Sequence, residues 1–97
     1  MNWHKSLLKR THEMVDEVKD IFDNEIELIY PIAHNVPWIY VKLEIKGCIS
    51  FEALSYINKQ FREFTENNNG LFNGLDIHTF DNKTTIRVSL IEKMDLE

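Results

Sequence analysis

Cysteine and long apolar runs are both scarce in this chain. Of its 97 residues only Cys48 is a cysteine, so no disulfide can form within one molecule. No apolar run follows the first five residues, and no stretch approaches the roughly 20 apolar residues of a membrane span. These shortages predict a cytoplasmic protein without a signal peptide or membrane association.

Basic residues are also in short supply. Eleven lysines and arginines stand against 16 aspartates and glutamates, which gives a formal net charge of −5. Nucleic-acid phosphates repel such a chain, so we expect no direct nucleic-acid binding, whereas a basic protein partner is compatible. With 43% hydrophobic and 28% charged residues, the composition predicts one globular domain over residues 1–97, with a frayed tail at 92–97.

The longest and most regular strand pattern covers residues 36–46. Ile39, Val41, Leu43 and Ile45 are apolar, and they alternate with two aromatics followed by charged residues. A period of two predicts a central strand with one face in the core. The other face then carries Trp38 and Tyr40, where a solvated strand would carry polar side chains.

The remaining patterns predict the element order α-β-β-α-β-β. The expected elements are a helix at 3–24, strands at 25–32 and 36–46, a helix from the N-cap Ser50 to the Asn67–Gly70 stop, and strands at 75–80 and 84–91. Two helices on one face of a four-stranded antiparallel sheet form a two-layer α+β sandwich, with the strands ordered third, fourth, second, first. This resembles a ferredoxin-like architecture whose first strand has moved to the end, and such an architecture implies no particular function.

Apolar and charge matches predict the register of each hairpin. Across a loop at 33–36, the expected pairs are Ile26 with Leu43, Glu27 with Lys42, Ile29 with Tyr40, and Pro31 with Trp38. Across Asp81-Asn82, they are Ile77 with Ile86 and Leu75 with Val88 in the core, and Asp76 with Arg87 and His78 with Thr85 on the other face. Pro31 favours an edge position for its strand.

One face of this sheet has no cover among the predicted helices. Its expected partner-binding residues are Ile29, Pro31, Trp38, Tyr40, His78, Phe80 and Arg87. Aromatic residues and arginine are enriched in interface hot spots, and an apolar cluster of this size is unfavourable in water. We expect a protein partner or a second copy packed sheet on sheet. The alternatives are a cover formed by Trp3, the tail or a bent loop, and a small ligand held between two subunits.

The first helix carries an acidic ridge that opposes its own dipole. The ridge consists of Glu13, Asp16, Glu17, Asp20 and Asp23. Acidic residues in the C-terminal half, and like charges four residues apart, both destabilise a helix. The ridge is therefore either a solvated face or a docking surface for a basic partner.

Two groups of residues have reactive side chains. Cys48, just before the second helix, could be a thiolate nucleophile or part of an anion site, but the sequence favours a buried, inert cysteine. Asp76, His78 and Arg87 could form an acid/base set, but a cross-strand ion pair beside a surface histidine is favoured. The four histidines lack metal-ligand spacing, so we expect no metal, no cofactor and no catalytic residue.

The sequence thus predicts a non-enzymatic protein-binding module that forms a homodimer. A narrower hypothesis is a small acidic inhibitor or immunity-type protein that blocks a basic, nucleic-acid-handling partner with the ridge. The alternative is a ligand-sensing regulatory domain with a metabolite at the dimer interface, in a polar pocket beside Tyr40, His78 and Arg87. A third hypothesis is an enzyme that uses Cys48 or His78.

Overall fold

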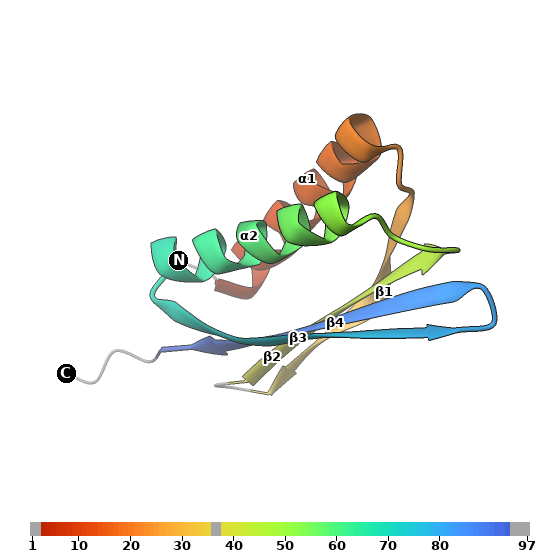
Figure 1. The fold of residues 1–97 in the computed structure, drawn as a ribbon. Helices are drawn as coiled ribbons and strands as arrows, with labels where there is room; N and C mark the ends of the chain where they lie inside the picture. Colours follow the sequence, from red (N-terminus) through yellow and green to blue (C-terminus); the bar gives the residue numbers. More distant parts are fainter. Residues whose placement is uncertain (1–2, 36–37, 94–97) are drawn as a thin grey trace.

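The computed structural model describes residues 3–35 and 38–93, apart from the side chains of residues 28–35. The elements are α1 (Trp3–Phe22), β1 (Ile26–Asn35), β2 (Trp38–Lys46), α2 (Phe51–Asn67), β3 (Gly70–Phe80) and β4 (Lys83–Glu92). The strands form one antiparallel sheet in the order β1-β2-β4-β3, and both helices lie on the same side of it (Figure 1). The predicted two-layer α+β sandwich and its strand order are confirmed, and the permuted ferredoxin-like description is compatible with them.

Strand β2 shows the alternation that its sequence predicted. Ile39, Val41 and Leu43 are fully buried beneath the helices, whereas Trp38 and Tyr40 are 40% and 45% exposed on the opposite face. The core between the two layers is completed by Leu7, Met14 and Val18 of α1, Ala53, Ile57, Phe61 and Phe64 of α2, and Ile86, Val88 and Leu90 of β4.

Hydrogen bonds at both ends of α2 hold the helix layer in place. The Ser50 hydroxyl accepts a bond from the Ala53 backbone N–H at 3.1 Å, so the predicted N-cap is confirmed. Beyond the last turn, Asn69 has a left-handed φ of 55°, a conformation that asparagine tolerates at the end of a helix. Trp3 donates from Nε1 to the Asn68 carbonyl at 2.6 Å, and this bond ties the start of α1 to the end of α2.

The β3–β4 hairpin has the predicted register from Leu75 to the turn. Asp81 and Asn82 both have positive φ, of 53° and 60°, as a two-residue hairpin turn requires. The burial predicted for Ile77 is wrong, because this side chain is 40% exposed. Its exposure follows from the shape of the molecule, since the turn end of the hairpin projects past the first turn of α2 (Figure 1).

The β1–β2 hairpin differs from the predicted register. Ile26 lies opposite Ile45 rather than Leu43, and Glu27 lies opposite Glu44 rather than Lys42. A two-residue slip keeps every side chain on its own face, so hydrophobic alternation could not exclude it. The register shifts again within residues 29–33, around Pro31, which cannot donate a ladder hydrogen bond. Strand β1 is an edge strand, as Pro31 predicted.

Residues 92–97 were predicted to be frayed, and the structure describes two of them, Glu92 and Lys93. Glu92 belongs to β4, and the Lys93 backbone N–H donates to the Asn69 carbonyl at 3.1 Å. These two residues are therefore held in place. Residues 94–97 lie outside the described residues.

Candidate functional site

The sheet face turned away from both helices, here called the outer face, has an apolar end. Trp38 lies opposite Ile91, and Ile91 lies opposite Leu71, so these residues form one row across β2, β4 and β3. Tyr40 lies two residues further along β2, on the same face. Trp38, Tyr40 and Leu71 are 40%, 45% and 47% exposed. This set of four residues, the outer-face cluster, is the kind of exposed apolar group that marks a contact surface.

Sequence reasoning missed Leu71 and Ile91 as members of this cluster. Residues 71–74 were expected to form a connection, but they belong to β3. Extending the predicted register would have placed Phe72 opposite Ile91. An extra residue between Phe72 and Gly74 exchanges the two faces and turns Leu71 outward. The alternation of apolar and polar residues along the strand does not by itself predict this bulge.

The structure spreads the predicted outer-face residues over the length of the sheet. Trp38 and Tyr40 lie at the apolar end, whereas His78 and the 76% exposed Phe80 lie near the Asp81-Asn82 turn. Arg87 lies between the two ends, opposite Lys42 on one side and Asp76 on the other. The side chains of Ile29 and Pro31 lie outside the described part of the structure. The backbone register shows Ala33 opposite Tyr40 and Asn35 opposite Trp38, so both predicted pairings are wrong.

Trp3 does not cover the outer face. It is 5% exposed on the helix side, where its ring packs edge-on against Phe64 with 5.0 Å between centroids. The other predicted covers, the loop at 36–37 and the tail at 94–97, lie outside the described residues. Both helices lie on the far side of the sheet, so neither covers the outer-face cluster (Figure 1).

A shallow hollow of about 340 Å³ adjoins the outer-face cluster. Its polar groups come from Tyr40, Asp76, Arg87 and Ser89. The pocket expected for a metabolite included Tyr40, His78 and Arg87. Tyr40 and Arg87 do line this hollow, and His78 is not among its lining residues.

Asp76, His78 and Arg87 share the outer face, as predicted, but His78 does not line the shallow hollow beside Asp76 and Arg87. Asp76 lies opposite Arg87, and His78 lies two residues further along β3. All three side chains are exposed. General acid/base catalysis needs a group within hydrogen-bond reach of a bound substrate, and such sites are usually concave. The geometry is that of a cross-strand pair of opposite charges beside a surface histidine.

Cys48 lies in the connection between β2 and α2, and its side chain is exposed. The prediction of a buried cysteine is therefore wrong. The physical reason is the position of the residue, because Gly47 has a φ of 92° and turns the chain out of the sheet at the end of β2.

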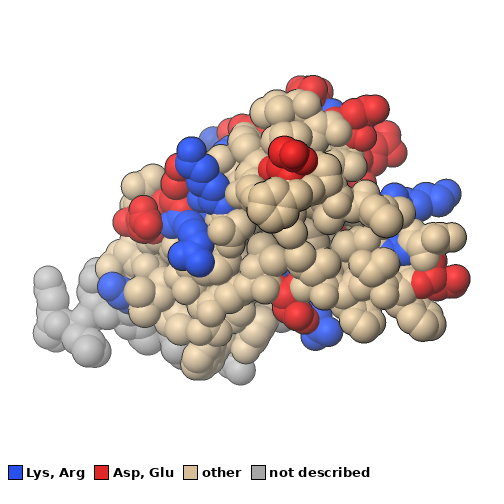
Figure 2. All heavy atoms as spheres, in the orientation of Figure 1, with Lys and Arg blue, Asp and Glu red and all other residues tan. Residues whose placement is uncertain are grey.

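The structure divides the acidic ridge into two parts. Acidic side chains gather over the upper, C-terminal end of α1 (Figure 2). Glu13, Asp16, Asp20 and Asp23 are exposed, as a solvated or docking face requires. Glu17 instead turns toward α2. Its carboxylate accepts two hydrogen bonds from the guanidinium of Arg10, which is also on α1, at 2.9 and 3.0 Å.

Glu17 belongs to a polar cluster that joins the two helices. The Tyr56 hydroxyl of α2 donates to Glu17 Oε1 at 2.6 Å, and Arg10 Nη2 also donates to Gln60 Oε1 at 2.5 Å. Hydrogen bonds first from Arg10 and then from Tyr56 hold the pKa of the Glu17 carboxyl below its ordinary value. The bond to Glu17, and then burial, raise the pKa of Tyr56. The principal role of Glu17 is therefore to hold α1 against α2.

Replacing Glu17 with Gln is expected to lower the free energy of unfolding by about 1 kcal/mol at neutral pH, because charge-assisted bonds to Arg10 are lost from a partly exposed site. A lowered folded-state pKa stabilises the protein above the ordinary carboxyl pKa of about 4.3, and this contribution fades as pH falls through the folded value. The difference from wild type should therefore shrink in acid, as measured by urea unfolding at several pH values. Asp20→Asn, on the exposed side of α1, is the control and should change stability little. Equal stability of wild type and Glu17→Gln at neutral pH would contradict the assigned role.

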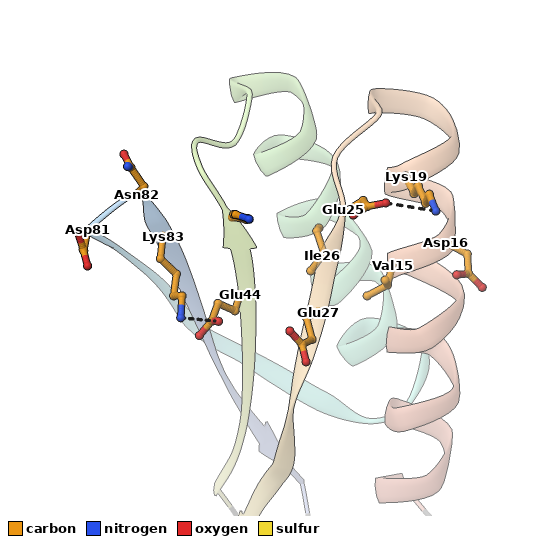
Figure 3. Close-up of a pocket in the computed structure, with 11 residues that line it drawn as sticks. Val15, Asp16, Lys19, Glu25, Ile26, Glu27, Glu44, Asp81, Asn82 and Lys83 are labelled. Carbon is orange, nitrogen blue, oxygen red and sulfur yellow. Dashed lines mark ion pairs between the residues drawn. The ribbon is translucent and has the colours of Figure 1, made fainter.

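A hollow of about 730 Å³ lies between α1, the start of β1, the end of β2 and the Asp81-Asn82 turn. Figure 3 shows α1 on one side, the Asp81-Asn82 turn on the other, and the ends of β1 and β2 between them. Lys19 pairs with Glu25 at 3.5 Å, and Lys83 pairs with Glu44 at 3.1 Å. Sequence reasoning did not anticipate this hollow, because its residues are far apart in the chain. The two ion pairs involve four of the eight charged side chains that line this hollow, and we assign it no function.

The described residues include neither a metal-holding cluster nor a membrane-spanning helix. No group of three or more His, Cys, Asp or Glu side chains within residues 3–35 and 38–93 is placed to hold a metal ion. In the same part of the chain, neither helix has the length and apolar character needed to span a bilayer.

No protein-family model matches the chain, and no curated protein is similar enough to count as a relative.

Proposed function

We propose that this protein is a non-enzymatic binding module that holds another protein on the outer face of its sheet. The observation that carries the proposal is the outer-face cluster, in which two aromatic side chains and a leucine are 40–47% exposed on the helix-free face. Large aromatic anchors supply most of the binding energy in protein interfaces. The exposure of Asp76, His78 and Arg87 supports a binding role over a catalytic one.

The narrower hypothesis concerns the chemistry of the partner. Four exposed acids of α1, together with a net charge of −5, suit a basic, nucleic-acid-handling protein in the cytoplasm. The ridge and the outer-face cluster lie apart. Trp38 lies opposite Ile91, at the end of the sheet near Trp3, whereas the exposed acids follow α1 toward its other end. We therefore assign binding energy to the cluster and long-range steering to the ridge.

The experiment places a photo-crosslinking residue at position 89, which lies opposite Tyr40 and leaves the cluster intact. A second version carries it at position 66, an exposed site on α2, as a control. The protein captured from position 89 alone is then purified, and its affinity is measured by calorimetry. Trp38→Ala should weaken that affinity about 30-fold or more, as for a hot-spot residue, and Glu66→Ala should leave it unchanged.

The outcomes separate the two parts of the proposal. Asp20→Lys should slow association with a basic partner and leave dissociation unchanged, because exposed charges act mainly on the encounter rate. An unchanged association rate would remove the ridge from the mechanism and leave the outer face in place. The same adducts from positions 89 and 66, or full affinity of Trp38→Ala, would refute docking on the outer face.

The second candidate function is the ligand-sensing domain. The hollow of about 340 Å³ beside Tyr40 and Arg87 favours it, because this volume lies at the lower limit for small-molecule sites. A metabolite that raised the melting temperature of the wild type, but not of Arg87→Ala, would favour this candidate over protein docking.

A further inference from the structure

The two edges of the sheet differ in how well they are protected. Edge strand β1 contains Pro31 and a register shift between Ile29 and Ala33, and both features hinder pairing with another strand. Edge strand β3 has 11 residues, and Asp76 is the only Asp, Glu, Lys or Arg among them. Beyond its bulge, residues 75–80 pair regularly with β4. A long, regular edge with little charge is a template for strand addition.

Apolar side chains flank this edge on both faces. Ile77, on the helix side, is 40% exposed, and Phe80, on the outer face, is 76% exposed. The hairpin extends past the start of α2, so the helix does not cover this part of β3 (Figure 1). A strand laid beside β3 would bury both side chains.

We propose that the occupant of this edge is β3 of a second copy, paired antiparallel about a two-fold axis at Ile77. Ile77 then faces Ile77 of the second copy, Asp76 faces His78, and Leu75 faces Thr79. Phe80 faces Gly74, above which the space is open, since a Cβ on Gly74 would meet no atom within 4 Å. An aromatic ring laid over an edge glycine is a favourable cross-strand pair.

Neighbouring registers lack this complementarity. An axis at residue 76 would place Asp76 opposite Asp76, and an axis at residue 78 would place His78 opposite His78. Two carboxylates directly opposite one another destabilise a strand pair, whereas an imidazole N–H opposite a carboxylate can donate a hydrogen bond to it. The axis at Ile77 is the one that sets each Asp76 against a His78.

The backbone groups also match in this register. The two residues that flank a two-residue hairpin turn hydrogen-bond to each other through both backbone groups. Along the ladder, such hydrogen-bonded pairs alternate with pairs whose backbone N–H and C=O groups point away from the partner strand. With the turn at Asp81-Asn82, the backbone N–H and C=O groups of Leu75, Ile77 and Thr79 are directed to the free edge. In the proposed pairing these three residues face the same three residues of the second copy, so each outward group finds a partner.

The helices leave room for this assembly. Over β3, α2 packs toward the start of the strand, where the Arg62 guanidinium lies 4.5 Å from the centroid of the Phe72 ring. The two copies of α2 therefore lie on opposite sides of the axis. The result is one continuous eight-stranded sheet with both outer-face clusters on the same side. The sequence predicted a homodimer packed sheet on sheet, whereas this dimer pairs the edge strands β3. It is also independent of the proposed docking of a partner on the outer face.

Sedimentation velocity over micromolar to millimolar concentrations tests the proposal. We expect a reversible, concentration-dependent dimer, because a single strand pair buries less than the roughly 1,600 Å² of a standard interface. Ile77→Lys should be monomeric throughout, since two lysines would face each other across the axis. His78→Lys should dimerise about tenfold more tightly than His78→Glu, because residue 78 faces Asp76 of the second copy.

The remaining outcomes decide between this edge and the outer face. Trp38→Ala should keep the wild-type dimerisation constant. A dimer lost in Trp38→Ala but retained in Ile77→Lys would overturn the proposal, and so would a wild type that is monomeric at every concentration. If Ile77→Lys fails to fold, as shown by circular dichroism, the His78 pair decides, and equal dimerisation of its two variants refutes the register.

Discussion

Replacing Trp3 with Ala is expected to lower the free energy of unfolding by about 3–5 kcal/mol, the range for deletion of a buried aromatic side chain. Trp3 is 5% exposed and packs edge-on against Phe64. Its Nε1 bond to the Asn68 carbonyl also joins the start of α1 to the end of α2. A Cβ on Gly70 would come within 2.9 Å of the Trp3 ring, so the site is closely packed. Urea unfolding followed by circular dichroism measures the loss.

Two control variants separate the contributions of Trp3. Trp3→Phe retains an aromatic ring and loses the Nε1 donor, so it should cost less than Trp3→Ala, with about 1 kcal/mol from the hydrogen bond. Trp38→Ala, at a 40% exposed site, should cost about 1 kcal/mol or less. The sequence predicted Trp38 on the uncovered face and left Trp3 as one possible cover for that face. Equal destabilisation by Trp3→Ala and Trp38→Ala would contradict the assignment of Trp3 to the core and Trp38 to the surface.

The parts of the fold that could be predicted are those where independent patterns agree. In β2, four apolar residues alternate with aromatic or charged residues, so only one of the two faces of the strand is apolar throughout and suited to the core. In the β3–β4 hairpin, a two-residue turn limits the register, and Asp76 opposite Arg87 confirms the choice made from apolar pairs. Local and long-range preferences then specify the same structure.

The errors arise where the ladder is irregular or where exposure depends on overall shape. The slip in β1–β2 leaves face parity unchanged, and the irregularity around Pro31 needs extra residues that alternation does not reveal. The exposure of Ile77 depends on how far the hairpin projects past α2. Neither the length of that projection nor the position of a bulge follows from residue types.

The candidate site was predictable to the same extent as the strands that carry it. Trp38 and Tyr40 were assigned to the outer face from parity alone, and the structure places them there. Leu71 joins them only because of the bulge before Gly74. Glu17 could not be separated from the acidic ridge, because its bond from Tyr56 depends on how α1 and α2 pack together. A helical pattern shows which residues share a face, and it does not show which of them meet another element.

Leu43→Ala is expected to lower the free energy of unfolding by about 2–5 kcal/mol. Leu43 is fully buried in β2, with Leu28 and Ile86 opposite it on the neighbouring strands. Truncation removes buried methyl groups and leaves a cavity in the middle of the sheet, where backbone pairing on both sides prevents collapse. Chemical unfolding measures this cost, and the variant should fold with an unchanged far-ultraviolet spectrum.

Lys42→Ala, one residue away, is the matched control, because the side chain of Lys42 points to the outer face and is exposed. Its cost should stay within about 0.5 kcal/mol, as for surface substitutions away from special features. The contrast between adjacent positions depends on strand parity, which also places Trp38 and Tyr40 in contact with solvent. If Lys42→Ala were the more damaging variant, β2 would be inverted, and the outer-face cluster would be buried beneath the helices. The docking surface therefore depends on the same alternation that this pair of variants measures.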